Sequence, residues 1–239
     1  MVAGIAHELR NPLNFVTSFA ELAREAVEEL RQSIGADTAE DVEEVLADLK
    51  ESTDKIAEHG RRADATVRSM MQHAQVRVGA PRPVALNGVV EEYAALALES
   101  AKARGLVSGS PLQLVLDPEV GRVMAAPEEL GRVVVNLVTN ALEAAADHSA
   151  VSAVSLSTRR VGHAVEVAVR DSGSGVCPDV LAKAFEPFYT TKPTGRGNVG
   201  LGLSISRDIV VGRFGGTLDL ANGTDGGAIS TAVLPAPRL

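Results

Sequence analysis

The stretch PEELGRVVVNLVTNALEAAA, residues 127–146, predicts one long helix, because Pro127 suits a first helical turn and most residues after it are apolar. Asn136 and Asn140 lie four residues apart, so their side chains share a helix face. Two asparagines on one face of an apolar helix indicate a function, and amide oxygens suit Mg²⁺. Two surface asparagines are the plain alternative. Glu143 could add charge to the metal site or lie on the surface.

A turn-like segment, Asp171-Ser172-Gly173-Ser174-Gly175, follows a predicted strand further along the chain. The Asp171 carboxylate could accept a hydrogen bond from the amino group of an adenine. Gly173 and Gly175 would let the backbone approach the adenine ring closely, because they carry no side chain. Taken alone, the segment is more simply an ordinary turn.

A second glycine pair stands before an apolar helix, in Gly200-Leu201-Gly202-Leu203. Its free N–H groups and the N-terminus of that helix would suit phosphate groups. One glycine pair is weak support, since many loops have this composition. Upstream, the run FEPFYTTK (185–192) leads into the loop, where Lys192 and Arg196 could reach a phosphate tail or be solvated loop charges. The candidate nucleotide contacts of this loop are Phe188, Thr190, Thr191, Lys192 and Arg196.

Helix and strand patterns are mixed around these segments. They predict an α+β domain in which helices cover one face of a mixed sheet. Helices are expected at 87–104, 127–146 and about 201–213, and strands at 112–116, 122–125, 151–159, 163–170, 216–220 and 228–234.

The N-terminal third has a different pattern. Residues 5–34 and about 38–75 carry apolar side chains at helical spacing, which predicts an αα-hairpin. A single hairpin buries only one seam, so two copies are expected to pair into a four-helix bundle and make a homodimer. The segment 78–83 contains one glycine and two prolines and is interpreted as a linker. It divides the chain into domains 1–80 and 81–239.

His7 lies near the start of the first predicted helix, and Glu8 follows it directly. A lone histidine on a helix is usually a polar surface residue. Here Glu8 could take a proton from the imidazole and leave the far ring nitrogen free to attack phosphorus. Asn11 lies one turn further on the same face. It also excludes an HExxH metalloprotease, which needs a second histidine at that position.

Composition narrows the classes of function. The formal charge of −8 argues against a surface that binds nucleic acid. No apolar run is long enough for a membrane span, although a longer parent protein could carry a sensor or membrane region. Cys177 is the only cysteine, which fits a reducing compartment and predicts a cytoplasmic protein.

Taken together and in this order, the segments resemble the sensor histidine kinases of two-component signalling. Five conserved boxes of that family have matches: the H-box, N-box, G1 box, F-box and G2 box. They correspond to residues 7–13, 136–141, 171–175, 185–188 and 200–203.

The resemblance implies a dimerisation and phosphotransfer hairpin followed by an α/β two-layer sandwich of the Bergerat (GHKL ATPase) type. It makes His7 the phospho-acceptor and Glu8 its base, and gives Asn11 a part in dephosphorylating a response regulator. It assigns Asn136 and Asn140 to Mg²⁺ and Asp171 to adenine. The remaining ATP-binding candidates are Gly173, Gly175, Phe188, Thr190, Thr191, Lys192, Arg196, Gly200, Leu201, Gly202 and Leu203.

The implied function is an ATP-dependent protein-histidine kinase that passes the phosphoryl group to the receiver domain of a response regulator, with regulator phosphatase activity as a second expectation. The alternatives are a GHKL-type ATPase that drives conformational change and a catalytically silent dimeric scaffold. The chain departs from the family pattern at two positions. Asn198 stands where many members have a glycine, and Glu143 replaces a lysine that some members use as a phosphate ligand.

Overall fold

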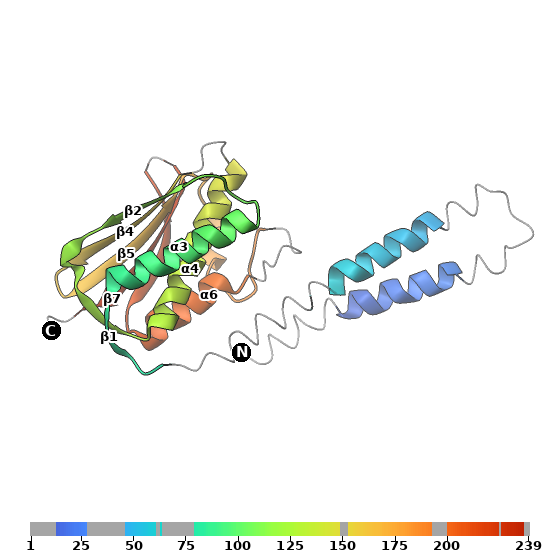
Figure 1. The fold of residues 1–239 in the computed structure, drawn as a ribbon. Coiled ribbons are helices and arrows are strands. Elements are labelled where there is room, and N and C mark those ends of the chain that lie inside the picture. Colours follow the sequence, from blue (N-terminus) through green and yellow to red (C-terminus); the bar gives the residue numbers. More distant parts are fainter. Residues whose placement is uncertain are drawn as a thin grey trace, which may run out of the picture. The chain divides into compact units, whose positions relative to one another are not determined.

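A computed structural model describes residues 13–27, 46–60, 63, 79–148, 153–192, 200–224 and 226–236 (Figure 1). The chain separates into two units, each with its own internal contacts. The first is Met1–Val76 with Thr190–Val199, and the second is Arg77–Tyr189 with Gly200–Leu239. Within the described residues, no helix is both long and apolar enough to span a membrane.

The first unit contains two helices, residues 13–27 and 46–60, which lie side by side in Figure 1. They are the described parts of the two helices that the apolar spacing predicts. Ring contacts join them, because His59 stacks on Phe15 with the ring centroids 4.6 Å apart. His59 also stacks on Phe19 at 5.9 Å, and the ammonium of Lys55 lies 5.0 Å from the Phe19 ring centre. The aromatic side chains therefore hold the two helices together along one seam.

The second unit is built on a five-stranded mixed sheet with the order β2-β4-β5-β7-β6. The first pair, β2 and β4, is parallel, and the three other pairs are antiparallel. This confirms the mixed sheet expected from the sequence. The strands are β2 (Leu112–Leu116), β4 (Val154–Val161), β5 (Ala164–Asp171), β6 (Thr217–Asn222) and β7 (Ala228–Pro235).

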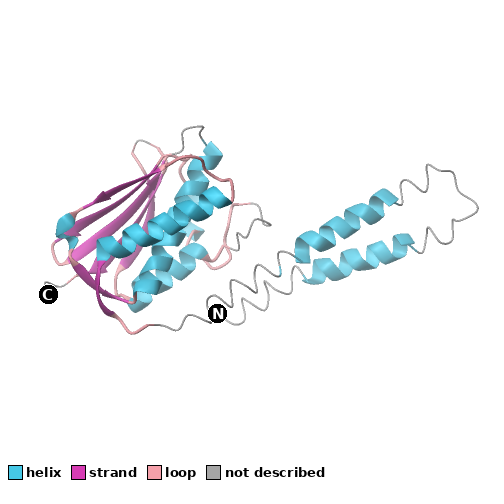
Figure 2. Ribbon diagram, viewed as in Figure 1, coloured by secondary structure: helices cyan, strands magenta, loops and turns pink. Residues whose placement is uncertain are grey.

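Helices cover one face of this sheet, which makes the two-layer α/β arrangement that was predicted (Figure 2). The expected helix at 201–213 is divided, because its second half widens into a π-helical turn in which the Phe214 N–H bonds to the carbonyl of Ile209. The helices are α3 (Leu86–Ala103), α4 (Pro127–His148), α5 (Pro178–Lys183) and α6 (Gly202–Arg207), with the π-helical η2 (Asp208–Arg213) and the short 3-10 turn η1 (Pro118–Val120).

The interpretation of 78–83 as a linker is wrong at its C-terminal end. Residues Arg82–Ala85 form β1, which pairs antiparallel with β3 (Arg122–Ala125) in a separate two-stranded sheet. Pro83 is tolerated there because β1 has a single neighbour strand and does not need every backbone N–H. The short β1 leads directly into α3. Its proline is also typical of a linker, so the strand could not be recognised from the sequence.

The core lies between the sheet and the helices. In β5 the residues alternate, so that Val165, Val167 and Val169 are buried against the helices. The apolar face of α4 supplies Leu137, Val138 and Leu142. The two asparagines of α4 consequently lie on the side of the helix away from the sheet, and both are partly exposed.

Helices α3 and α4 pack closely at a glycine. A Cβ added to Gly131 would lie 2.4 Å from the ring of Tyr93, so no larger residue fits beneath that ring. Burial raises the pKa of the Tyr93 hydroxyl, and the carboxylates of Glu92 and Glu128 add to the effect. This contact fixes the distance between the two helices that carry the polar groups described below.

Candidate functional site

Asp171 is the last residue of β5 and is buried, with an exposed fraction of 8%. Its Oδ1 accepts hydrogen bonds from the backbone N–H of Gly173 at 2.8 Å and of Ala228 at 3.1 Å. One carboxylate oxygen therefore holds the turn after β5 against the start of β7. The other, Oδ2, accepts no hydrogen bond from the described residues and is available to a ligand that donates one.

The glycines around Asp171 are required by close backbone contacts. A Cβ on Gly173 would lie 2.9 Å from the carbonyl oxygen of Ala144 on α4. A Cβ on Gly227 would lie 1.9 Å from the carbonyl oxygen of Asp171, and Gly227 has a φ of +68° that favours glycine. Gly227 was missed by sequence reasoning, because it belongs to a separate loop and acquires its role only when β7 pairs with β5.

The turn after β5 is closed by a side chain from β6. Asn222 Oδ1 accepts a hydrogen bond from the backbone N–H of Val176 at 2.7 Å, while its Nδ2 donates to the Val176 carbonyl at 2.9 Å. The same asparagine faces Gly175, where an added Cβ would lie 2.9 Å from Asn222 Oδ1. Cys177, the residue after Val176, is exposed. Asn222 carried no signal in the sequence, because it lies two residues beyond the strand expected at 216–220, whereas β6 extends to it in the structure.

The two asparagines of α4 have different surroundings. Asn136 Nδ2 donates to the Gly202 carbonyl at 3.1 Å and to Ser206 Oγ at 3.2 Å, which ties α4 to the first turn of α6. Asn140 is partly buried, and its side chain makes no hydrogen bond to any described residue. Asn136 is thus partly structural, whereas the amide of Asn140 is free for a ligand.

The chemistry of these groups suits a metal only together with a phosphate. Among the described residues, no cluster of three or more His, Cys, Asp or Glu side chains could hold an ion. Asn140 and the oxygen of Asn136 offer neutral oxygens on one face of α4. Mg²⁺ commonly binds through one or two protein ligands, several waters and the phosphates of a substrate, so the residues present fit that ion.

The helical segment formed by α6 and η2 is held at its C-terminal end by an ion pair. Glu129, which is buried in the first turns of α4, pairs with Arg213 at the end of η2. Arg132 lies nearby, and burial together with the charge of Arg213 lowers the pKa of its guanidinium. Asn136 and Glu129 therefore fix the start and the end of this segment against α4.

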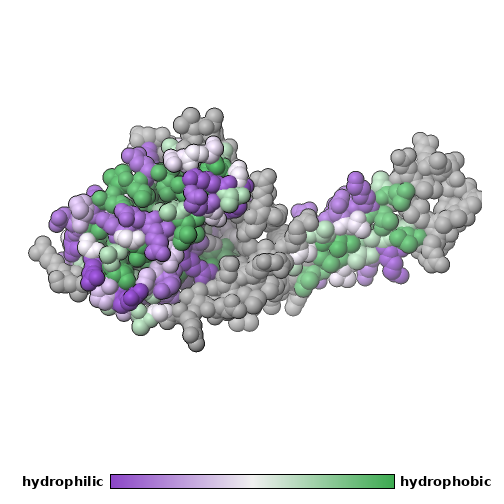
Figure 3. Space-filling view, in the orientation of Figure 1, coloured by the Kyte–Doolittle hydropathy of each residue, from purple (hydrophilic) through white to green (hydrophobic). Residues whose placement is uncertain are grey.

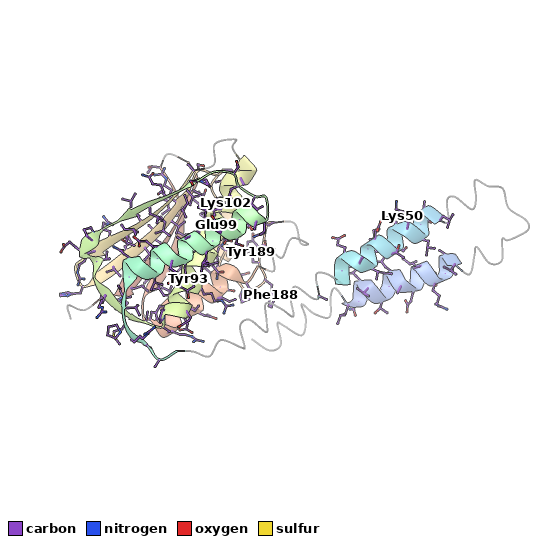
Figure 4. The ribbon with its side chains drawn as sticks, in the orientation of Figure 1. Lys50, Tyr93, Glu99, Lys102, Phe188 and Tyr189 are labelled. Atoms are coloured by element: carbon purple, nitrogen blue, oxygen red, sulfur yellow. The ribbon has the colours of Figure 1, made fainter. Side chains whose placement is uncertain are left out.

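Gly200 lies against the backbone of the loop before it. A Cβ on Gly200 would lie 2.5 Å from the carbonyl carbon of Phe188, and Gly200 has a φ of +72°. Phe188 itself has a φ of 67°, which is uncommon for a residue with a side chain and stores backbone strain. Figure 4 labels Phe188 and its neighbour Tyr189. The side chains of Leu201 and Leu203 are partly buried and pack against the core.

The remaining candidate residues of the loop either contact only their neighbours in the sequence or lie outside the described residues. Lys192 donates its backbone N–H to Thr190 Oγ1 at 3.2 Å, and both residues, like Thr191, group with the first unit. Arg196 lies outside the described residues, as do His7, Glu8 and Asn11. The roles expected for these residues stay predictions.

Glu143 is not a surface residue, and that alternative is wrong. Its side chain is 8% exposed and forms an ion pair in which Arg104 Nη2 lies 3.1 Å from Glu143 Oε1. Arg104 follows α3 and is 39 positions away in the sequence, so nothing local to Glu143 indicated the pair. A buried carboxylate without a cation would be strongly unfavourable, which explains the contact.

The domain that carries these groups matches a family of ATPases. Residues 125–238 match the family of histidine kinase-, DNA gyrase B- and HSP90-like ATPases. Residues 1–78 match the His Kinase A (phospho-acceptor) domain. The two matches follow one another along the chain in the order expected from the sequence.

Individual curated proteins that resemble this chain are sensor proteins and sensor histidine kinases. The chain is 33% identical to the sensor protein FixL of Bradyrhizobium diazoefficiens over 236 residues, which are 99% of this chain and 43% of FixL. It is 29% identical to the sensor histidine kinase ZraS of Escherichia coli over 235 residues, 98% of this chain and 45% of ZraS. The chain belongs to the sensor histidine kinases of two-component signalling. It spans less than half the length of these curated relatives.

Solved structures share the fold. The catalytic domain of histidine kinase ThkA has a TM-score of 0.55 at 26% identity, over 66% of this chain and 97% of that chain. Histidine kinase ThkA in complex with the response regulator protein TrrA has a TM-score of 0.60 at 24% identity, over 98% of this chain and 60% of that chain. The second likeness extends the agreement in fold to almost the whole chain.

Proposed function

We propose that this protein is an ATP-dependent protein-histidine kinase that phosphorylates His7 and passes the phosphoryl group to an aspartate of a response regulator. The observation that supports it is the occurrence, on one chain, of a phospho-acceptor domain and of the Asp171, Asn136 and Asn140 arrangement. In this proposal, residues 1–80 serve dimerisation and phosphotransfer and residues 81–239 bind ATP. A reducing, ATP-supplied compartment, the cytoplasm, suits both activities and the single cysteine.

The ATP-binding residues have distinct tasks. Asp171 Oδ2 accepts the hydrogen bond of the adenine amino group, while Oδ1 keeps the turn in place. Asn140, with the oxygen of Asn136, holds Mg²⁺, whose charge would offset the negative charge of the phosphates. Backbone N–H groups of Gly200 and Gly202 would bind the phosphate tail, and Phe188, Thr190, Thr191, Lys192 and Arg196 are proposed as further contacts from the preceding loop.

Phosphoryl transfer itself needs little from the protein besides placement. Glu8 accepts the proton of one imidazole nitrogen of His7, and the other nitrogen attacks the γ-phosphorus of ATP. The bond from that phosphorus to the bridging oxygen breaks, and ADP leaves with the electron pair. The phosphohistidine then gives its phosphoryl group to the carboxylate of a receiver-domain aspartate.

Incubation of the protein with γ-labelled ATP tests the proposal against its alternatives. A histidine kinase retains a label that is labile in acid and stable in base. An ATPase that drives conformational change releases free phosphate and retains no label. A silent scaffold does neither, and either of the last two results contradicts the kinase.

The dimer rests on apolar side chains that the hairpin leaves exposed, which Figure 3 shows as green surface on the helices. They are Leu13, Phe15, Leu22, Val27 and Leu46. Because folding of one hairpin does not cover them, we propose that a second copy does and completes a four-helix bundle.

Leu22→Glu is expected to weaken this dimer. Each buried leucine is worth about 1.5–3 kcal/mol and both copies change, so the dissociation constant should rise about a hundredfold or more. Light scattering at micromolar concentration measures the change. Asn14→Glu adds the same charge at an exposed position of the same helix and should leave the dimer intact. A monomeric wild-type chain would contradict the bundle.

Asn11→Ala is expected to separate two activities. An amide one turn after His7 can orient a water for attack on the phospho-aspartate of a docked regulator, but it takes no part in attack on ATP. The variant should retain autophosphorylation and lose most dephosphorylation of the regulator. Both rates are measured in one preparation. Parallel loss of both would show a structural role beside Pro12, and loss of neither would remove Asn11 from the site.

A further inference from the structure

Glu143 occupies the ligand-facing side of α4 although its charge repels a triphosphate. It lies three residues after Asn140 and seven after Asn136, so all three side chains project from the same face of the helix. The face is the one turned away from the core formed by Leu137, Val138 and Leu142. A carboxylate at this position would weaken ATP binding unless a cation is held beside it.

The cation is Arg104, and its place is fixed by the end of α3. The helix closes with a Schellman motif, in which the Leu106 N–H bonds to the Ala101 carbonyl at 3.0 Å and the Gly105 N–H to the Lys102 carbonyl at 2.9 Å. Gly105 has a φ of +67°, as this motif requires. The backbone of Arg104 is thus held at the helix end, from which its side chain reaches Glu143.

The geometry leaves donors on Arg104 for a ligand. A guanidinium carries five N–H donors in a planar fork. The hydrogen bond from Nη2 to Glu143 Oε1 uses one of them. The Arg104 side chain is 36% exposed, in contrast to 8% for Glu143. The pair therefore buries its carboxylate and presents its guanidinium to solvent on the side where the asparagines lie.

We propose that Arg104 is a nucleotide-binding residue that contacts the phosphate tail of ATP while Glu143 holds its guanidinium in place. The chain thereby supplies from the end of α3 the cation that a lysine at position 143 of α4 would supply. This inference rests on the proposed ATP site and adds a ligand to it that neither the motifs nor their spacing indicated.

The experiment compares two variants of the full chain that leave no buried charge unpaired. Glu143→Gln keeps an oxygen that accepts from Arg104, and the double variant R104Q/E143Q removes the cation as well. Calorimetry with Mg-ATP and with adenosine measures both affinities. The double variant should bind ATP about tenfold more weakly than E143Q, because a charged hydrogen bond to phosphate is lost, and adenosine within about twofold.

Two further variants control the result. Lys102→Gln removes a positive charge two residues away, where Lys102 pairs with Glu99 on α3 (Figure 4), and should leave ATP affinity unchanged. The variant R104Q/E143K returns a cation to the site from α4 and should restore most of the ATP affinity. If that variant is folded and does not recover ATP binding, Arg104 is not a phosphate ligand.

The remaining outcomes are distinct. Equal loss of ATP and adenosine affinity with a lowered melting temperature in R104Q/E143Q would show a purely structural ion pair and overturn the inference. Unchanged ATP affinity would overturn it as well. If the wild-type chain binds adenosine and ATP equally weakly, the proposed function fails first, and the inference falls with it.

Discussion

The protein with His7 replaced by Gln is expected to take up no label from γ-labelled ATP while still binding ATP. Glutamine has no nucleophilic nitrogen, and no other histidine has a carboxylate directly after it in the sequence. Loss of the acceptor removes the reaction completely, so labelling should fall to background, whereas the ATP site on the second unit is unchanged. Autoradiography after a fixed incubation measures the label, and calorimetry measures ATP affinity.

His163→Gln is the matched control, because His163 is an exposed histidine of the second unit and should be dispensable. His59→Gln is less suitable, since His59 stacks on Phe15 and Phe19 and supports the hairpin. Full labelling of the His7 variant would overturn the assignment of the acceptor. Label mapped to His59 or His73 in the wild-type protein would have the same consequence.

Asp171→Asn is expected to weaken ATP binding roughly tenfold to a hundredfold. The variant loses the hydrogen bond from the adenine amino group and leaves that group buried and unpaired, which costs about 1–3 kcal/mol. The asparagine oxygen can still accept from Gly173 and Ala228, so the turn should survive. Its amide, however, places a donor at the position of Oδ2, which is proposed to accept a hydrogen bond from the amino group of adenine. The variant should therefore also distinguish ATP from GTP less well.

Calorimetric titration with both nucleotides measures this effect, and the melting temperature shows whether the variant is folded. Asp219→Asn removes the same charge from an exposed position on β6 and should leave both affinities unchanged. Asp171→Ala should lower the melting temperature as well, because it removes the acceptor for two backbone N–H groups. Unchanged ATP affinity in a folded Asp171→Asn protein would contradict the adenine assignment.

Local patterns predicted most of the elements of the second unit. The strands at 112–116 and 122–125 were placed to the residue, and α4 was placed from its proline and its apolar run. In contrast, the pairing of β2 with β4 and the strand order could not be predicted, because they depend on contacts between distant segments. The strand β1 was missed because its proline also indicates a linker.

The candidate site shows the same division. Residue type and spacing located Asp171 and both asparagines, since each stands out from its immediate neighbours. Which of these side chains also stabilise the fold was not predictable. Asn136 bonds to Gly202, 66 positions away, and Asp171 bonds to Ala228, 57 positions away. For Glu143 the sequence allows both a metal-binding and a surface role, and its partner Arg104 has no local pattern that indicates the ion pair. Contacts between segments assign tasks that composition alone leaves undecided.

The exposed Cys177 follows Val176, whose backbone is held by Asn222, and no other cysteine is present in the sequence. A maleimide dye would therefore attach at one atom, a few residues beyond the carboxylate of Asp171. Because the anchoring turn is closed by two hydrogen bonds, the dye would sit at a defined point of the domain. This chain thus carries a natural attachment point for an optical reporter beside the proposed adenine site, and no cysteine has to be introduced into it.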